Sequence, residues 1–339
     1  MRVIVIGGAG YMGSILVRGL LRRGHRVRVI DNLTFGDSPL AGVAAQVELD
    51  VRNMQDLEVP HLAGADAVVN CGGLSNDPTA DWNPRRNWEE NFHAVVRTAR
   101  MSRDADVKKF IFASSCSVYD GVPGNCPPLS ESSAVAPVGH YSQAKYAAEE
   151  ALREIADPSL SIVAFRMATL FGPSPRMRFD LVVNTMLRNA LTQRSVQVAG
   201  DGTLWRPLLS VQDAARAYVM AIEQPLPEAF TLLNLVGENR QLMDIARIVA
   251  DAAAREGQPV AITSCDLPAR VRSYRADGAL ARKILGFRPS ESAESVARFM
   301  STMFRSWPAE RLFAPVYENI RWLSQAMTQD EVMEGSTTT

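Results

Sequence analysis

The N-terminal stretch joins a short apolar run to a glycine-rich turn and an amphipathic segment. Residues 3–6 are four consecutive β-branched residues, a pattern typical of a strand buried on both faces of a parallel sheet. Residues 12–23 carry apolar side chains at helical spacing, and Gly24 follows where a helix would end. A second apolar run, residues 27–30, stops at Asp31. The pattern therefore predicts a strand, a loop, a helix and a second strand.

Short apolar runs and helical patterns go on alternating through the first half of the chain. This alternation predicts an α/β fold, a doubly wound parallel sheet of the Rossmann type with right-handed crossovers. In such sheets ligands bind beyond the carboxyl ends of the strands, so the residues after each strand are candidate site residues. We expect further strands near residues 47–51, 66–70, 109–113 and 160–165, a long helix over 88–102, and another helix from Tyr141 onward.

The strict alternation ends after residues 171–173, where glycine and proline become frequent and the loops lengthen. We expect residues 1–174 to form the Rossmann domain, 175–329 a smaller C-terminal substrate-binding lobe, and 330–339 a flexible tail. Residues 230–235 are expected to return to the main sheet. Residues 307–325 carry apolar side chains near helical spacing, which favours a cap over the lobe or an interface with another chain.

Composition limits the classes of function. The chain has 339 residues, a formal net charge of −1 and no basic run interleaved with aromatic residues, so nucleic-acid binding is not expected. No apolar stretch is long enough to span a membrane. The four cysteines lack C-x-x-C spacing and the four histidines lack metal-ligand spacing, which predicts free thiols in a cytoplasmic protein and no metal site.

The glycine-rich loop predicts a dinucleotide site. Residues 8–13 fit G-x-G-x-x-G, and Gly7, Gly10 and Gly13 also fit G-x-x-G-x-x-G. Glycines let the backbone approach a pyrophosphate, and the helix N-terminus offers it free N–H groups. Asp31 falls where a carboxylate would accept hydrogen bonds from a ribose diol and repel a 2′-phosphate, which favours NAD over NADP. The alternative is a purely structural turn.

Two later segments carry the residue types that hydride-transfer chemistry needs. Tyr141 and Lys145 lie four residues apart, hence on one helical face. Here the chain resembles the short-chain dehydrogenase/reductase superfamily, and more narrowly its extended branch of NAD-dependent nucleotide-sugar epimerases and dehydratases. The resemblance covers about residues 1–305. It also matches residues 114–119 to the stretch bearing the catalytic hydroxyl, which falls on Ser115.

The resemblance implies a role for each catalytic residue. A free tyrosine has a pKa of about 10 and is a poor base at neutral pH. The Lys145 ammonium and the positive nicotinamide ring would lower the pKa of Tyr141, so that its phenolate takes the proton of a sugar hydroxyl. Lys145 would also donate to the nicotinamide ribose. Ser115 would share the substrate hydroxyl and steady the developing alkoxide.

The same resemblance implies two sets of binding residues. Asp50 and Val51 match the pair that holds the adenine, and Asn91 would help to order the segment near the catalytic residues. The implied cofactor contacts are Gly7, Gly10, Tyr11, Met12, Gly13, Asp31, Asn32, Asp50, Val51, Cys71, Gly72, Gly73, Asn91, Ser114, Tyr141 and Lys145. The implied substrate contacts are Ser75, Asn76, Ser115, Cys116, Asn184, Arg206 and Arg272.

The substrate contacts have structural alternatives. Arg206 and Arg272 suit a diphosphate, which Asn184 could also meet through its amide, but such arginines are also common on solvated surfaces. Ser75 and Asn76 could touch the sugar or simply form a turn. Cys116 could transfer a proton, as a cysteine near the catalytic hydroxyl does in a related 3,5-epimerase, or could be a small packed residue.

Two positions narrow the reaction. The 4,6-dehydratases of this family carry an Asp-Glu pair directly after the catalytic hydroxyl residue, where this chain has Cys116 and Ser117. We therefore expect a nucleotide-sugar epimerase acting at C4 by transient oxidation, with a nucleotide-sugar or small-carbonyl reductase or dehydrogenase as the alternative. A 4,6-dehydratase or a non-catalytic cofactor-binding protein is less favoured. A homodimer is implied by the family, and the identity of the sugar and the nucleotide stays open.

Overall fold

The computed structural model describes residues 1–254, 259–267 and 270–325, and the predicted tail at 330–339 lies outside them. Seven parallel strands form the main sheet in the order β10-β6-β5-β4-β1-β2-β3. From β1 the chain builds outward to one edge and then, from β4, to the other, which confirms the doubly wound prediction. The strands are β1 (Arg2–Ile6), β2 (Arg26–Asp31), β3 (Val47–Val51), β4 (Ala67–Asn70), β5 (Lys109–Ser115), β6 (Ser161–Met167) and β10 (Phe230–Leu235).

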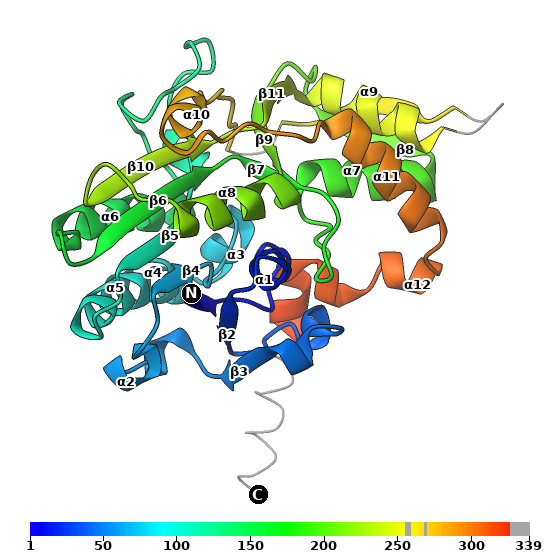
Figure 1. The fold of residues 1–339 in the computed structure, drawn as a ribbon. Coiled ribbons are helices and arrows are strands. Elements are labelled where there is room, and N and C mark those ends of the chain that lie inside the picture. The colour runs from blue at the N-terminus through cyan, green and yellow to red at the C-terminus, as the bar shows by residue number, and fades with distance from the viewer. Residues whose placement is uncertain (255–258, 268–269, 326–339) are drawn as a thin grey trace, which may run out of the picture.

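Helices cover both faces of this sheet (Figure 1). Alternate side chains of β1 point to opposite faces, so Val3 and Val5 join one apolar core while Ile4 and Ile6 join the other. Because both faces are covered, the strand is apolar from Val3 to Ile6, as its sequence indicates. The first core contains α1 (Gly13–Arg22), α8 (Val211–Glu223) and α10 (Ala279–Leu285), and the second contains α2 (Val59–Leu62), α5 (Ala94–Asp104) and α6 (His140–Ile155).

The helix expected over residues 88–102 is divided. It consists of α4 (Pro84–Trp88), a single π turn (Glu89–His93) and α5, and a short helix α3 (Asp77–Trp82) precedes it. The π turn carries Asn91 inward, where the side chain is fully buried. None of the helices in the described part of the chain is both long and apolar enough to cross a membrane.

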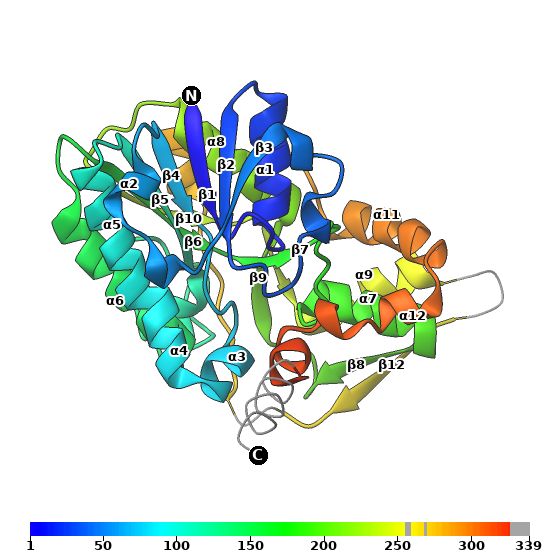
Figure 2. The same ribbon diagram turned by 90° about the horizontal axis from the view of Figure 1, so that it is seen from below.

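The second half of the chain builds a smaller lobe with its own apolar core (Figure 2). Its strands are β7 (Thr169–Phe171), β8 (Ser195–Ala199), β9 (Trp205–Ser210), β11 (Glu238–Gln241) and β12 (Ala261–Cys265). Its helices are α7 (Val182–Gln193), α9 (Leu242–Ala253), α11 (Ala293–Arg305) and α12 (Ala309–Leu312). The prediction that residues 230–235 return to the main sheet is confirmed, because β10 pairs with β6. Helices α8 and α10 also pack in the core of the main sheet.

The segment expected to be helical over 307–325 comes as three short pieces. These are α12, a 3₁₀ turn (Pro315–Tyr317) and a helical stretch over residues 319–325. Pro308 and Pro315 interrupt it, since proline lacks the N–H that a continuing helix needs. In Figure 1 this orange-to-red segment turns back from the lobe toward α1 and β2.

Candidate active site

A cavity of about 720 Å³ lies between the carboxyl edge of the main sheet and the lobe. One end is formed by the loop after β1. Gly7 has φ = 77°, and a Cβ on Gly13 would lie 2.1 Å from the Gly7 carbonyl oxygen. Only glycine therefore lets α1 start this close to the loop. The resulting cradle, with a helix N-terminus that has no side-chain cap, fits the pyrophosphate of a dinucleotide.

Asp31 stands at the end of β2 and faces the same cavity. Its Oδ2 accepts a hydrogen bond from the Ala9 N–H at 2.9 Å, and its Oδ1 accepts one from the Leu33 N–H at 2.8 Å. These bonds fix the carboxylate while leaving each oxygen a lone pair for a ribose hydroxyl. Burial raises the pKa of Asp31, and the two backbone donors oppose that rise.

The residues expected to hold the adenine lie next to the cavity wall but do not form it. Arg28 Nη2 donates to the Asp50 carboxylate at 2.8 Å, Arg52 Nε donates to it at 3.2 Å, and the Val51 side chain is exposed. Neither Asp50 nor Val51 lines the cavity. The wall at this end comes from the residues just after them: Arg52, Met54 and Gln55. The loop after β3 thus reaches the cavity one to four residues later than the motif indicates.

Three predicted catalytic residues meet at the other end of the cavity. Ser115 ends β5, while Tyr141 and Lys145 lie one turn apart on α6. The Lys145 Nζ is 5.6 Å from the centroid of the Tyr141 ring and 4.8 Å from that of Phe112. Burial lowers the pKa of Lys145 to about 8.

Neighbouring groups shift the pKa of the Tyr141 phenol. Desolvation raises its pKa to about 12, and the nearby Asp77 carboxylate acts in the same direction. The Arg178 guanidinium and the Ser115 hydroxyl act against the rise. Without a further positive charge the phenol therefore stays protonated at neutral pH, which is why the predicted chemistry needs the positive nicotinamide ring beside it.

A buried ion pair between Arg166 and Glu149 packs next to the catalytic end of the cavity. Arg166 contacts both oxygens of the Glu149 carboxylate at 2.6 to 3.0 Å, and the Ser114 hydroxyl also donates to it. Glu149 follows Lys145 by one turn of α6. Ser114 lines the cavity, and its hydroxyl donates its hydrogen to Glu149, which joins β5 to α6.

Cys116 was expected among the substrate contacts, and the structure contradicts this. Its side chain is 1% exposed, does not line the cavity, and donates from Sγ to the Arg166 carbonyl oxygen at 3.1 Å. Burial raises the pKa of the thiol further. The residue turns into the core because the chain begins a 3₁₀ turn (Cys116–Tyr119) directly after Ser115. The alternative of a small packed residue is therefore the better interpretation.

Two asparagines also lie outside the cavity wall. Asn184 Nδ2 donates to Tyr11 Oη at 3.2 Å and to the Arg178 carbonyl at 3.0 Å, so both of its hydrogens are used within the protein. Asn91 Nδ2 donates to the Leu74 carbonyl at 2.9 Å, and a further bond to Asn87 uses its second hydrogen. Asn184 ties the glycine loop to the lobe, and Asn91 orders the segment after β4.

The other predicted contacts line the cavity. Ser75, Asn76, Arg206 and Arg272 lie on the substrate side. Asn76 caps α3 through its Oδ1, and Arg272 pairs with the Asp77 carboxylate. Burial lowers the pKa of Arg206 to about 10. The predicted cofactor contacts that line the wall are Gly7, Gly10, Tyr11, Met12, Gly13, Asp31, Asn32, Cys71, Gly72, Gly73, Ser114, Tyr141 and Lys145.

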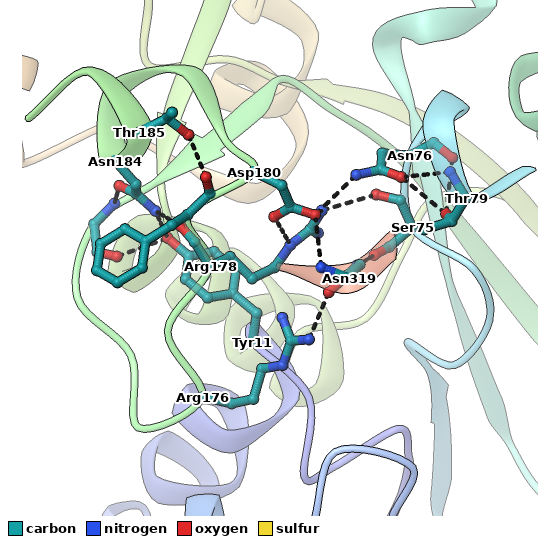
Figure 3. A network of polar contacts seen from close by, with 12 residues as sticks. Tyr11, Ser75, Asn76, Thr79, Arg176, Arg178, Asp180, Asn184, Thr185 and Asn319 are labelled. Atoms are coloured by element: carbon teal, nitrogen blue, oxygen red, sulfur yellow. Dashed lines mark hydrogen bonds and ion pairs between the residues drawn. The ribbon is translucent and has the colours of Figure 1, made fainter. Parts of the chain in front are cut away.

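The polar network drawn in Figure 3 joins predicted site residues to residues that were not predicted, among them Arg176, Arg178, Asp180 and Asn319. Arg178 forms a two-point ion pair with Asp180, at 2.8 Å and 3.0 Å, and Asn76 Nδ2 donates to the same carboxylate at 2.9 Å. Asn319 from the C-terminal segment reaches this network, as does Arg176. One feature of the sequence could have indicated these residues. Arg176, Arg178 and Asp180 lie in a proline-containing loop directly after β7, and ligands bind at the carboxyl ends of strands in such folds.

Comparison with known proteins identifies the family of the chain. The model of the NAD dependent epimerase/dehydratase family matches residues 3–235. The UDP-glucose 4-epimerase of Lactobacillus helveticus is 25% identical over 341 residues, a match that covers 90% of this chain and 96% of that protein.

Two solved structures share the fold, although at their low identities the likeness shows the fold alone. The UDP-N-acetylglucosamine 4-epimerase from Methanobrevibacter ruminantium is 24% identical with a TM-score of 0.81, covering 90% of this chain and 98% of its own. The NAD-dependent hexosamine 5,6-dehydratase TunA is 23% identical with a TM-score of 0.78, covering 91% and 99%. With more than half of its length matched by the family model, the chain belongs to the NAD-dependent epimerase/dehydratase family and is an NAD-dependent enzyme.

Proposed function

We propose that this enzyme is a nucleotide-sugar 4-epimerase that inverts C4 through a transient 4-keto sugar, with Tyr141 as the base. The observation that carries the proposal concerns the acidic residues at the catalytic end of the cavity. Among the described residues lining that end, each carboxylate forms an ion pair with an arginine. These pairs are Asp77 with Arg272, Glu90 with Arg86, and Asp180 with Arg178.

This arrangement leaves Tyr141 as the group that exchanges a proton with the sugar. Elimination of water needs a protonated acid near the departing hydroxyl. Although burial alone would raise the pKa of Asp180, the Arg178 guanidinium holds it below its usual range. The two positions after Ser115 hold Cys116, whose thiol faces the core, and Ser117, whose hydroxyl is no acid at neutral pH. Both observations favour epimerisation over dehydration.

Tyr141, Ser115 and Lys145 have different roles in the proposed inversion. Tyr141, as phenolate, takes the proton of the C4 hydroxyl, and Ser115 donates a hydrogen bond to the developing alkoxide. Bound NAD supplies the acceptor for the C4 hydride and the means to return it. The positive charge of Lys145 stabilises the phenolate form of Tyr141. When the ketone presents its opposite face, Tyr141 returns the proton to the oxygen, so the sugar is inverted with no net oxidation.

The nucleotide part is proposed to bind the lobe through its diphosphate. Arg206 and Arg272 line the substrate side, and a planar guanidinium suits two phosphate oxygens at once. Burial of Arg206 beside Arg272 leaves a positive charge that a diphosphate would neutralise. UDP-hexoses are the first substrates to test, because two of the three relatives compared above are named as epimerases of UDP sugars.

The test is to incubate the purified enzyme with UDP-, dTDP-, GDP- and CDP-hexoses while following the sugar by NMR and the absorbance of NADH. We expect inversion at C4 without accumulation of NADH. Tyr141→Phe should abolish inversion, whereas Tyr146→Phe, a matched change on the same helix outside the cavity wall, should retain it. Stoichiometric consumption of NADH on 4-keto sugars would instead identify a reductase, and loss of water from the product a dehydratase.

We propose in addition that the enzyme is a homodimer built on α5 and α6. The support is the family resemblance of these helices. Sedimentation velocity of the purified protein would check it, and a monomer at micromolar concentration would contradict it.

A further inference from the structure

Arg176 is a buried cation with an incomplete set of partners. It lies in the loop between β7 and α7, and its side chain is 2% exposed. Its Nη2 donates to Asn319 Oδ1, and its guanidinium carbon lies 3.9 Å from the centroid of the Phe35 ring. Its Nε is buried and has no hydrogen-bond partner. Within residues 1–254, 259–267 and 270–325, no carboxylate lies within ion-pair distance of it.

A buried charge without a counter-ion is costly, so such a group normally faces a ligand or shifts its ionisation. Burial lowers the pKa of Arg176 to about 9, and the neighbouring Arg178 adds to the effect. An arginine has five N–H donors, and among the residues that the structure describes this one uses a single donor. Its remaining donors are available to an anion in the cavity, whose wall Arg176 helps to form.

The position of Arg176 identifies the anion. The guanidinium lies close enough to Asp31 to oppose the rise in pKa that burial causes there. Asp31 marks the adenosine ribose and the glycine loop marks the pyrophosphate in a dinucleotide fold. Phe35, on which Arg176 stacks, follows β2 and lines the same part of the wall. In a dinucleotide bound between these landmarks, the anionic group would be the pyrophosphate.

The C-terminal segment holds Arg176 in this place. Asn319 accepts from Arg176 and donates from Nδ2 to Ser75 Oγ at 2.9 Å (Figure 3). Trp322 Nε1 donates to the Thr34 carbonyl at 2.6 Å, and Leu323, 3% exposed, lines the cavity. Residues 319–323 therefore connect the loop after β2 with the loop after β4. They lie beyond the stretch that the family model matches.

We propose that Arg176 binds the pyrophosphate of NAD opposite the glycine loop, and that residues 319–323 form a strap that fixes Arg176 and encloses the cofactor. NAD then leaves only after the strap has released the loop after β2. A strap of this kind suits an enzyme that keeps one NAD through many turnovers. The proposal rests on the NAD dependence of the family, and it stands whichever sugar reaction the enzyme performs.

The first test measures ligand affinity with and without the phosphates. Arg176→Gln should weaken binding of ADP-ribose about 10- to 100-fold, because charge-assisted hydrogen bonds are lost. Binding of adenosine, which has no phosphate, should change by no more than about two-fold. Arg298→Gln, an exposed arginine on α11, is the matched control and should leave both affinities unchanged. Equal weakening of adenosine and ADP-ribose, or no weakening of either, would overturn the pyrophosphate contact.

The second test measures escape of the cofactor. The exchange of bound NAD for isotope-labelled NAD, followed by mass spectrometry, gives the dissociation rate without any sugar substrate. Trp322→Phe keeps the ring but removes the hydrogen bond to Thr34, and we expect exchange about 3- to 10-fold faster. A chain ending at Glu318 should exchange faster still, and a chain ending at Gln325 should behave as the full chain. Circular dichroism would check that the chain ending at Glu318 still folds. A rate of NAD exchange that is unchanged in both Trp322→Phe and this shorter chain would refute the strap.

Discussion

The Lys145 ammonium nitrogen lies 5.6 Å from the centroid of the Tyr141 ring, one turn further along the same helix. We expect a charge at this separation to alter the proton affinity of its neighbour, and both side chains line the cavity. Tyr141 on its own has a pKa raised by desolvation to about 12, so its activity as a base depends on nearby positive charges. In the proposed mechanism, the ionisation of Lys145 therefore controls the protonation of Tyr141.

Lys145→Met should lower the rate at pH 7 about 10²- to 10⁴-fold. Losing the positive charge raises the pKa of Tyr141, so the acid limb of the kcat profile should move to higher pH. Burial lowers the pKa of Lys145 to about 8, so the wild-type ammonium loses its proton as pH rises through that value, and activity should fall again there. The variant should lack this alkaline limb. Lys108→Met, an exposed lysine, serves as control. An acid limb that stays in place would contradict the role of Lys145.

Asp77→Asn tests the opposite charge. The Asp77 carboxylate raises the pKa of Tyr141, so its neutralisation should lower that pKa and move the acid limb of the profile to lower pH. Asn preserves the shape of the side chain. Asp81→Asn is the matched control, because Asp81 also pairs with Arg270 but is absent from the cavity wall. The pH dependence of kcat for both variants is the measurement, and a shift to higher pH in Asp77→Asn would argue against the electrostatic account.

Cys116→Ala should keep at least half of the wild-type kcat. The Sγ atom donates to the Arg166 carbonyl in the core and has no access to the cavity. The change should instead lower the free energy of unfolding by about 1 kcal/mol, because it opens a small space and leaves that carbonyl without its donor. Steady-state kinetics and urea unfolding measure the two effects. A loss of activity of more than a hundred-fold in a stably folded variant would restore Cys116 as a catalytic residue.

Gly13→Ala should prevent NAD binding. The added Cβ would lie 2.1 Å from the Gly7 carbonyl oxygen, so either the loop or the start of α1 must move away from the pyrophosphate position. Gly19→Ala is the matched control on the same helix, because its Cβ would lie 3.6 Å from the nearest atom, a Val219 methyl. That change should stabilise the fold by about 0.5–1 kcal/mol. Isothermal titration with NAD and thermal unfolding would show both results, and full NAD affinity in Gly13→Ala would contradict the cradle.

The sequence by itself determined the main sheet and the residues at its strand ends. The glycine loop, Asp31, Ser115, Tyr141 and Lys145 all meet at the cavity, as predicted. Each belongs to a short periodic segment, and parallel strands bring their carboxyl ends to one edge. For the glycine loop and Asp31, local pattern and this geometric rule were enough, whereas Ser115 and the pair on α6, Tyr141 and Lys145, were identified through the family resemblance.

Only the tertiary structure decided the direction of side chains near those ends and the long-range contacts. Cys116 and Asn184 turn away from the cavity because the turn after β5 and the start of α7 direct them into the protein. The contact of Arg176 with Asn319 joins residues 143 positions apart, and that of Asn319 with Ser75 joins residues 244 apart. Loops without periodicity leave no sequence signal for such pairs, since their partners are chosen by the packing of the lobe against the sheet.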